Sequence, residues 1–486
     1  MSRAQKFLAV LSAVTFLPAC ALIASSAPPV YADDPPCPGS GTAVVVGQND
    51  STFDVGAVQA AVNGNRSVVL TGTFDFGVAG RVVLNCDVDI TGEADTSGAP
   101  LTTIRSGEWN FFTPYPSFKT PLPAGPRVSI QHLHFVAARG TAVHLAYSGG
   151  ASLRANVIDD MRARYIGAVG ERAAIVVGPA LLGGAPNNTF FPGLVSGDIQ
   201  IADNTIDVSG PESPLTTRGT GMFVSMYVGA DVRIERNLVT GNTRTGLAIL
   251  DGTFDSAGRG SVVIAGNVVR SDVRFGFIPP GPRAPIGIVT GFNNQRVFGS
   301  DPNLTMIPVL IENNTIEMGD PTPGAAASSS PMGIINIWNG AVIRGNKITV
   351  HGHTGYACPG ALRLCTSGGF LATASHQVLL HNEVSGEGCN AIRFGGTVDG
   401  QERKDNVAIG NNITQFQEFT SDFENCADVW LEPNAHDNTV VGNSGSVIDD
   451  GTNNQVTGLA PAKGGVGAAV SEGQQDAQEV AALAYD

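Results

Sequence analysis

Residues able to transfer protons lie close together at His351, His353 and Tyr356. Counting seven residues past a recurrent asparagine reaches Arg244, Arg274 and His353 in three separate segments. Histidine and tyrosine can act as acids or bases, and arginine binds carboxylates. We therefore predict a turn at which the first three residues move a proton while the two arginines bind substrate. The alternative is that His351 and His353 are solvated loop residues.

A second candidate surface follows from the alternation of side chains along extended segments. If Ile335, Leu362, Ile392 and Val429 face inward, the residues that face outward on successive strands are Asn336, Arg363, Arg393 and Trp430. Two arginines beside a tryptophan would suit a sugar, because the indole packs on its apolar face and the arginines bind hydroxyls or a uronate. The alternative is a solvent-facing ladder in which these arginines pair with acids such as Asp428.

Glycoside hydrolysis usually needs a pair of carboxylates. Candidate pairs are Asp159 with Asp160, Asp203 with Asp207, and Asp251 with Asp255. The chain has 43 acidic residues, so pairs at short spacing also arise by chance. None of these pairs is diagnostic.

These residues must be positioned by a repeated unit, apolar-x-x-Asn-x-apolar. It recurs, with looser copies, at Asn156, Asn204, Asn237, Asn267, Asn314, Asn346, Asn382, Asn411 and Asn443. Self-similarity at intervals of 29 to 48 residues is typical of a solenoid.

The repeated unit has the period of a strand. Apolar residues alternate through it, as at Ile199, Ile201 and Ile206. A second alternating run follows most of the asparagines, at 246–250, 333–338, 360–364, 390–394 and 427–431. We therefore predict a strand, an asparagine turn, a second strand and a variable loop in each repeat, with repeats stacked to bury their apolar faces.

Asparagine has two reasons to recur at this turn. It tolerates the left-handed backbone conformation, and stacked asparagines can hydrogen-bond to one another. With these motifs, residues 41–457 resemble the right-handed parallel β-helix family of pectate-lyase-like proteins with parallel β-helix repeats. The resemblance implies an all-β, right-handed, single-stranded parallel β-helix that engages a polysaccharide.

The resemblance carries no catalytic residue onto this chain. Polygalacturonase-like members have an Asn-Thr-Asp, Asp-Asp, Gly-His-Gly, Arg-Ile-Lys series, whereas here His351-Gly-His353 replaces Gly-His-Gly and Arg-Ile-Lys is missing. Pectate-lyase-like members use a basic residue as the base and hold Ca²⁺ with acids. No such motif is present, so we predict no cofactor and no metal, with Ca²⁺ left as an alternative.

Composition limits the partners. The formal net charge of −15 argues against nucleic acid, which needs a basic surface. It also counts against long-range attraction of polyanionic glycans. A length of 486 residues is compatible with one domain, because a solenoid grows in one dimension.

The first 32 residues resemble an export signal. Arg3 and Lys6 precede an apolar run, and Val30-Tyr31-Ala32 forms a small-residue cleavage site. The alternatives are a membrane helix, which Pro18 argues against, and a lipid anchor at Cys20. We expect a secreted monomer without a membrane span, or a lipid-anchored one at the cell surface.

Six cysteines follow this signal, an even number that implies disulfides in an exported chain. Cys389 and Cys426 each lie three residues before the first inward residue of a strand, so we pair them across adjacent coils. We pair Cys37 with Cys86, which leaves Cys358 and Cys365 by elimination. No His/Cys spacing typical of zinc occurs.

The ends of the solenoid differ from its coils. Residues 53–64 place Val55, Val58 and Val62 at helical spacing, which predicts a capping helix. The aromatic segment 94–126 is expected to pack on the wall of the solenoid. The β-helix domain is expected to span 33–457, and 458–486 to form a flexible tail.

Together these features predict an exported polysaccharide-engaging β-helix, with a polysaccharide lyase or glycoside hydrolase as the possible enzyme. The alternative is a non-catalytic surface, adhesion or carbohydrate-binding solenoid. Fold alone does not decide between them.

Overall fold

Eight of the nine asparagine repeats wind into a coil of three strands in the computed structural model of the protein, and the described residues of the last, at Asn443, form two. In one coil, β13 (Ile199–Ala202) leads through Asn204 into β14 (Thr205–Asp207), and β15 (Thr220–Ser225) follows. The short strand directly after the asparagine was missed in the two-strand repeat predicted from sequence. Its three residues are too few to give a periodic signal of their own.

The structure describes residues 37, 40–114, 124–161, 173–178, 195–209, 219–225, 227–241, 245–271, 286–291, 307–319, 331–351, 368–372, 375–388, 390–395, 403–418 and 427–458. All of them belong to the unit that runs from Pro36 to Asp486. The predicted signal segment, the tail beyond 458 and the cysteines at 358, 365, 389 and 426 lie outside these ranges. Among the described residues, no helix is long and apolar enough to cross a membrane.

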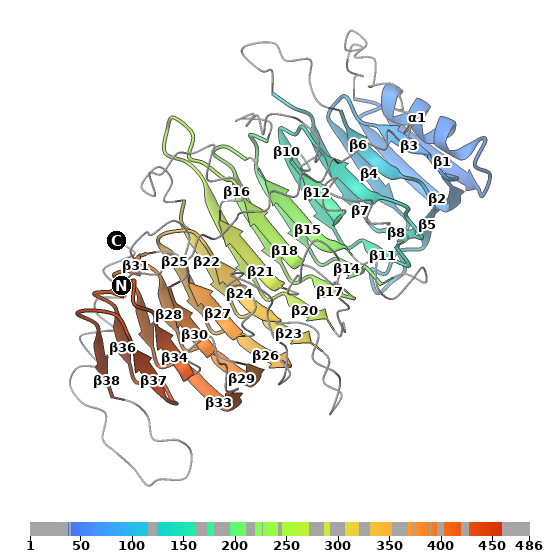
Figure 1. Ribbon diagram of the computed structural model, residues 1–486. Helices are drawn as coiled ribbons and strands as arrows, with labels where there is room; N and C mark the ends of the chain where they lie inside the picture. Colours follow the sequence, from blue (N-terminus) through green and yellow to red (C-terminus); the bar gives the residue numbers. More distant parts are fainter. Residues whose placement is uncertain are drawn as a thin grey trace, which may run out of the picture. The chain divides into compact units, whose positions relative to one another are not determined.

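Strands of successive coils pair in parallel and form two long sheets, of 24 and 12 strands (Figure 1). The larger sheet has two rows that meet at the asparagine. Its first row contains β1 (Thr42–Gln48), β2 (Ser67–Asp75), β4 (Val88–Gly92), β7 (Arg127–Gln131), β10 (Gly150–Arg154), β13, β16 (Asp231–Glu235), β19 (Ser261–Ala265), β22 (Val309–Glu312), β25 (Ala341–Arg344), β28 (Val378–Leu380), β32 (Val407–Ile409), β36 (Thr439–Val441) and β38 (Gln455–Thr457).

The second row continues from the C-terminal end of β2. It contains β5 (Thr102–Arg105), β8 (Leu133–Val136), β11 (Val157–Asp159), β14, β17 (Leu238–Thr240), β20 (Val268–Ser271), β23 (Thr315–Gly319), β26 (Lys347–His351), β29 (Glu383–Gly388) and β33 (Asn412–Glu418).

The 12-stranded sheet closes the other side of each coil. It contains β3 (Arg81–Val83), β6 (Trp109–Thr113), β9 (Thr141–Leu145), β12 (Ala173–Val177), β15, β18 (Thr245–Leu250), β21 (Ile286–Gly291), β24 (Met332–Asn336), β27 (Gly368–Ala372), β30 (Asn390–Phe394), β34 (Ala427–Leu431) and β37 (Val447–Asp449). A separate pair joins β31 (Arg403–Lys404) to β35 (Ala435–His436).

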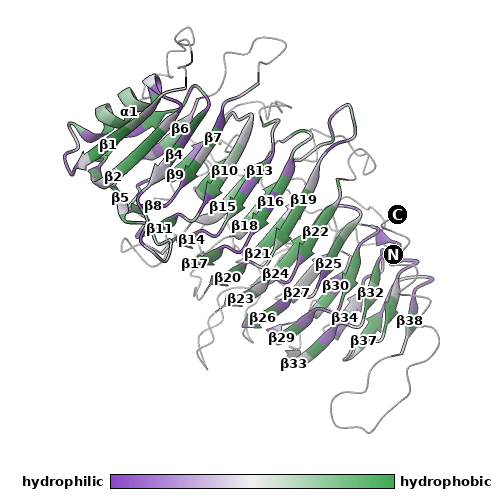
Figure 2. Ribbon diagram, turned by 180° about the vertical axis from the view of Figure 1, so that it is seen from behind, coloured by the Kyte–Doolittle hydropathy of each residue, from purple (hydrophilic) through white to green (hydrophobic). Residues whose placement is uncertain are grey.

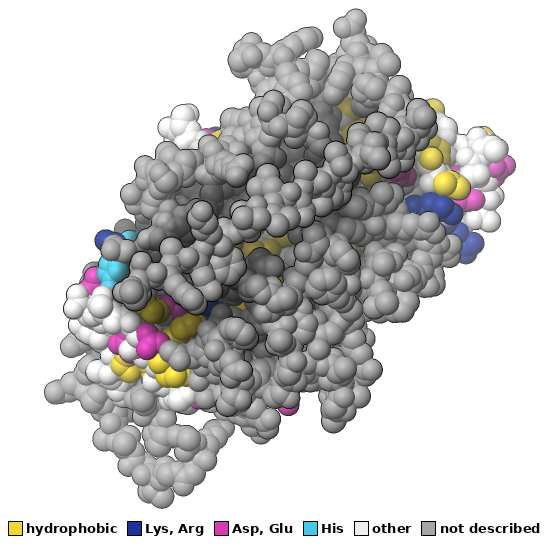
Figure 3. All heavy atoms as spheres, viewed as in Figure 1, with side chains coloured by type: hydrophobic (Ala, Val, Ile, Leu, Met, Phe, Trp, Pro, Cys, Tyr) yellow, Lys and Arg dark blue, Asp and Glu magenta, His cyan; other side chains and the backbone are white. Residues whose placement is uncertain are grey.

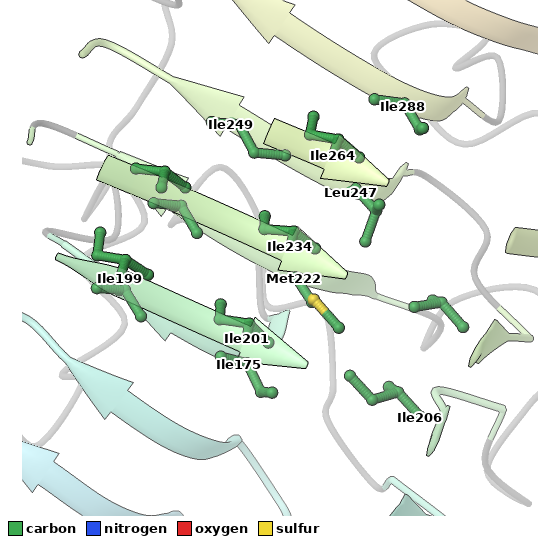
Figure 4. Close-up of a cluster of buried hydrophobic side chains, with 14 of the residues drawn as sticks. Ile175, Ile199, Ile201, Ile206, Met222, Ile234, Leu247, Ile249, Ile264 and Ile288 are labelled. Carbon is green, nitrogen blue, oxygen red and sulfur yellow. The ribbon is translucent and has the colours of Figure 1, made fainter. Parts of the chain in front are cut away.

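The core lies between the two sheets. Ile201, Ile234 and Ile264 stack along the first row, opposite Met222 and Leu247 of the 12-stranded sheet (Figure 4). In β16, for example, the buried Val232 and Ile234 alternate with the exposed Asp231 and Arg233, and hydrophobic and hydrophilic segments are visible along the first row in Figure 2. Burial of this continuous apolar interior is what favours stacking of the coils.

The asparagines form the predicted ladder. In each step the backbone N–H and the Nδ2 of one asparagine both donate to Oδ1 of the next, as from Asn237 to Asn267 at 3.0 and 2.9 Å. The ladder runs from Asn156 to Asn443 and its members are buried. Each step thereby gives the buried Oδ1 of one asparagine two donors from its neighbour.

One detail of the predicted turn is wrong. The left-handed conformation is adopted by the residue before each ladder asparagine, for example by Asp203, Arg236 and Asn313. The asparagine itself points inward, because only there can its amide reach the next coil. The preceding residue makes the turn.

The C-terminal coils contain a second ladder at another corner. Gln377 N–H donates to Asn406, Asn406 to Asn438, and Asn438 to Asn454, with heavy-atom distances of 2.9 to 3.0 Å. Each of these residues also follows a residue with positive φ. In the sequence analysis this ladder went unrecognised, because it begins with glutamine and its final step spans only 16 residues.

The N-terminal end confirms two predictions and corrects one. Helix α1 (Asp54–Gly64) buries Val58 and Val62 against the first coils, as expected of a cap. The disulfide Cys37–Cys86 is present, with Cα atoms 5.5 Å apart. The segment expected to pack on the wall instead supplies β5 and β6, and Trp109 opens β6.

The chain is an all-β, right-handed parallel β-helix with an N-terminal capping helix.

Candidate functional site

The structure describes three of the residues predicted to form a site, His351, Arg393 and Trp430. Predicted site residues outside the described ranges are Arg244, Arg274, His353, Tyr356 and Arg363. Cys389 and Cys426 are also outside them, but the residues that follow each, Asn390 and Ala427, pair in register on β30 and β34. That disulfide therefore stays a prediction.

His351 ends β26 on the 24-stranded sheet. Its Nε2 lies 3.6 Å from Oε1 of Glu317, and Arg270 Nε lies 3.6 Å from Oε2 of the same carboxylate. All three belong to neighbouring strands of the second row, and Glu317 is exposed. These contacts lie on a different sheet from Arg393 and Trp430, so the structure does not unite the two predicted surfaces.

Members of the predicted carboxylate pairs contact other residues and not each other in the interactions of Asp159, Asp255 and Asp203. Asp159 Oδ2 lies 2.7 Å from His134 Nε2, and Arg259 lies against Asp255 with a closest approach of 2.6 Å. Asp203 accepts from Arg236 Nε at 2.8 Å, and this hydrogen bond lowers the pKa of the Asp203 carboxyl. These acids form isolated surface contacts.

The outward register of the 12-stranded sheet was only partly predicted. Arg393 and Trp430 do face outward on adjacent strands, with Ile392 and Val429 inward. On β24, however, the inward residue is Ile334 and the outward one is Ile335. A shift of one residue exchanges the two faces of a strand.

Two further predictions about this sheet are wrong. Asn336 lies on the inward side, where it accepts a hydrogen bond of 2.6 Å from Thr290. The strand between β24 and β30 is β27, at 368–372, and not 360–364. The position next to Arg393 is therefore held by Leu371, where Arg363 was expected.

Backbone positions in register with the outward residues of this sheet form a continuous line, which we call the outer row. Its backbone positions are Phe112, His144, Val176, Phe223, Ala248, Val289, Ile335, Leu371, Arg393, Trp430 and Ile448. The middle of the row belongs to two apolar clusters that are separate from the core. Polar and aromatic groups gather at its two ends.

The C-terminal end of the outer row holds a buried ion pair. The Arg393 guanidinium lies over the Trp430 ring, 4.7 Å from its centroid, and Arg393 Nε donates to Oε1 of Glu432. The side chains of Arg393 and Glu432 are only 4% and 3% exposed. Burial at this level fixes both groups, because neither can be separated from the other without a large cost.

A second carboxylate lies beside this pair. Trp430 Nε1 donates to Asp450 Oδ2 at 2.9 Å, and Asp450 N–H donates to the carbonyl of Leu431 at 2.9 Å. Glu432 and Asp450 directly follow the paired residues Leu431 and Asp449 of β34 and β37. Their backbones are thus about 5 Å apart, the spacing of neighbouring strands.

Arg403 completes this group. It is buried at the start of β31, and its N–H donates to the carbonyl of Asn434 at 2.9 Å, in the turn that follows Glu432. Burial lowers the pKa of Arg403, and attraction to Glu432 opposes that change. We call Arg393, Arg403, Trp430, Glu432 and Asp450 the C-terminal cluster.

The other end of the outer row has a related arrangement. Arg81 lies over Trp109, 4.5 Å from its centroid, and pairs with Glu108 at 3.0 Å. His144 packs edge-on against Trp109 and Phe112. We call these five residues the N-terminal cluster.

His144 is the most perturbed group in the N-terminal cluster. Burial lowers its pKa to about 4, although a backbone hydrogen bond with Gly178 works against the shift. Its Nε2 is buried without a hydrogen-bond partner. The ring is therefore neutral at physiological pH and packs as an aromatic residue.

The C-terminal cluster has more of the chemistry expected of a site. Hydrophobic and acidic side chains lie together over the β34 and β37 end of the sheet (Figure 3). Glu432 and Asp450 were missed by the sequence analysis, although both follow strands of similar pattern and their proximity follows from register. Within the described ranges, no group of three or more His, Cys, Asp or Glu residues is placed to hold a metal ion.

Comparisons with known proteins give little beyond this geometry. No family model matches the chain, and no curated protein matches it. The crystal structure of a DFA-IIIase from Arthrobacter chlorophenolicus A6, in complex with GF2, aligns with 83% of this chain and 95% of its own. Sequence identity is 9% and the TM-score is 0.36.

Proposed function

We propose that the protein is an exported polysaccharide-binding β-helix that hydrolyses glycosidic bonds at the C-terminal cluster. The observation that supports this most is the pair Glu432 and Asp450, which are carried by neighbouring strands and oriented by different partners. Hydrolysis of glycosides usually needs two carboxylates on either side of the scissile bond. Export is supported by the disulfide Cys37–Cys86, since disulfides persist in oxidising compartments.

Each carboxylate has a distinct role in this proposal. Glu432, held by Arg393, provides a fixed negative charge next to the developing oxocarbenium ion. Asp450 is exposed, so a leaving-group oxygen and an attacking water can both reach its carboxylate, and it acts as the acid and base. Asp450 keeps its orientation through the indole N–H of Trp430.

Trp430 and the exposed Asp450 form the sugar-binding edge, and the buried Arg393 supports it from within. The guanidinium already covers one face of the indole, so a sugar contacts the edge of the ring that carries the Nε1–H.

A non-catalytic solenoid is the second candidate, and one observation favours it. Glu432 and Arg393 are buried against each other, as in an ion pair that serves the fold. The same residues would then fix the C-terminal coils of a rigid spacer or carbohydrate-binding surface.

The test is a panel of plant, microbial and animal polysaccharides assayed for new reducing ends and for unsaturated products. We expect reducing ends from the natural protein, and a loss of at least about a hundredfold in Glu432→Gln and in Asp450→Asn. Glu108→Gln, in the exposed pair of the N-terminal cluster, is the matched control and should retain activity. Chelation of metals should change nothing, because a carboxylate pair needs none.

Other outcomes would reject hydrolysis. Unsaturated products that disappear in His353→Ala would assign a lyase reaction to the predicted turn with His351, His353 and Tyr356, and its arginines Arg244 and Arg274. Binding of a glycan without any product would favour the non-catalytic solenoid.

A further inference from the structure

The exposed large hydrophobic side chains of the described residues all lie near the N-terminal end. They are Val44, Val46, Phe53, Val78 and Leu101. Val44 and Val46 are the outward residues of β1, and they are 66% and 62% exposed. The described coils beyond residue 101 expose no comparable side chain. Concentration of apolar surface at one place is typical of an interface.

Strand β1 is the outermost strand at this end of the solenoid (Figures 1 and 2). In the described part of the chain it pairs only with β2, from Thr42 opposite Ser67 to Gln48 opposite Thr73. Its opposite edge can therefore accept another strand. Natural edge strands usually avoid this with lysine, proline or a short length. β1 has seven residues, Thr-Ala-Val-Val-Val-Gly-Gln, with no charge and no proline.

Its side chains alternate cleanly. Ala43 and Val45 pack against the core, whereas Val44 and Val46 face solvent. The two exposed valines are symmetric about Val45. In an antiparallel pair centred on Val45, Val44 of each strand lies opposite Val46 of the other, so both contacts are valine on valine.

The other end of the solenoid exposes polar side chains on its last strand. The last strand, β38, exposes Gln455 and Thr457, and its Val456 packs against the core. A head-to-tail contact would place the apolar edge of β1 against this polar edge. A two-fold contact instead joins two identical apolar edges, which closes the assembly at a dimer.

We propose that β1 is the interface of a head-to-head dimer, in which β1 of a second copy of this chain pairs antiparallel to it about Val45. A second copy is the partner because the strand is complementary to itself. The contact is also uncharged, which limits repulsion between two chains that each carry a formal charge of −15. This dimer replaces the monomer that was expected from the sequence. The proposal does not depend on the proposed hydrolysis.

Sedimentation equilibrium of the purified protein over a concentration series tests the proposal. We expect a mass twice that of one chain, which falls to one chain on dilution. The double variant Val44→Lys/Val46→Lys sets like charges opposite each other and should weaken the dimer at least tenfold. Both positions are exposed, so at a dilution where the natural protein is a single chain the thermal unfolding temperature of the two proteins should be the same.

The matched control is Gln455→Lys/Thr457→Lys, which adds the same charge to the exposed positions of β38 and should leave the dimer intact. A register test uses Val44→Cys mixed with Val46→Cys, which should cross-link under mild oxidation, while neither variant cross-links alone. A single-chain mass at every concentration would overturn the proposal. So would a dimer that survives the β1 lysines, or one that is lost with the β38 lysines.

Discussion

The two ends of the outer row use the same three residue types with different burial. Arg81 lies 4.5 Å from the Trp109 centroid and pairs with Glu108, as Arg393 lies 4.7 Å from that of Trp430 and pairs with Glu432. The side chains of the first ion pair are 34% and 35% exposed, and those of the second are 4% and 3% exposed. The stacking geometry is shared, so burial is the variable that separates the two ends.

The two clusters also differ in the hydrogen bonds that surround them. The second ladder runs beneath the C-terminal cluster, and Asn438 Nδ2 donates to the Arg403 carbonyl at 3.3 Å. At the N-terminal end the position of a ladder asparagine is held by Leu133, whose N–H donates to Asn156. The buried ion pair of the C-terminal cluster thus lies beside a hydrogen-bonded ladder, and such support is what a pre-organised site requires.

The largest expected effect comes from breaking the buried pair. Arg393→Ala leaves Glu432 buried without this partner, and we expect the free energy of unfolding to fall by about 4 kcal/mol. Arg81→Ala, at the exposed pair, should change it by less than about 1 kcal/mol. Urea unfolding of both variants measures the difference.

Replacing both members of the buried pair sharpens this result. Arg393→Met with Glu432→Leu should recover most of the lost stability, since apolar side chains of similar volume tolerate burial. Equal losses in Arg393→Ala and Arg81→Ala would mean that burial does not separate the two ends.

The N-terminal cluster should make stability depend on pH. Its His144 has a pKa of about 4 in the folded chain and 6.5 as its ordinary value. Between these values the unfolded chain binds a proton that the folded chain does not. The free energy of unfolding should therefore fall as pH decreases from 6.5 to 4, by about 3 kcal/mol from this residue.

The variant His144→Gln isolates that contribution. Urea unfolding at pH 7 and at pH 4 should show a smaller loss in the variant than in the natural protein. The same loss in both would assign the pH dependence to other groups.

A smaller effect is expected from the second ladder. Asn438→Ala removes the acceptor of two donors of Asn406, and should lower the free energy of unfolding by about 2 kcal/mol. Asn454→Ala, at the partly exposed end of the ladder, should cost less. Hydrogen exchange of the Arg403 and Glu432 amides should accelerate in Asn438→Ala, and an unchanged rate would show that the ladder does not support the cluster.

Much of the fold could be predicted from the sequence because its signals are local. Asn204 and its equivalents recur with alternating apolar neighbours, and one residue type at one corner fixes the stacking of coils. The cap at Val58 and Val62 was visible for the same reason. The second ladder was missed because Gln377 opens it and its last step spans only 16 residues.

The residues that face outward on the 12-stranded sheet could be predicted only for strands in which apolar and polar residues alternate. Ile392 and Val429 fix the direction of Arg393 and Trp430, because the alternation there is between apolar and polar residues. In β24 both faces are buried, so Ile334 and Ile335 are equally apolar and the pattern does not choose between them. The position of β27 was predicted wrongly because two short apolar runs, at 360–364 and 368–372, both have the pattern of a strand in the same coil.

The candidate carboxylates needed tertiary information. Glu432 and Asp450 stand just beyond the ends of their strands, 18 residues apart, and come together through the pairing of Leu431 with Asp449. Nothing local distinguishes them from the other acids in the chain.

The most direct test of the account is a calorimetric titration of matched tryptophan variants with the polysaccharide selected by the panel. We predict that Trp430→Phe, which removes the indole N–H that holds Asp450, weakens binding at least tenfold, whereas Trp109→Phe binds as the natural protein does. Equal affinities for both variants, or a loss confined to Trp109→Phe, would contradict placement of the sugar site at the C-terminal cluster.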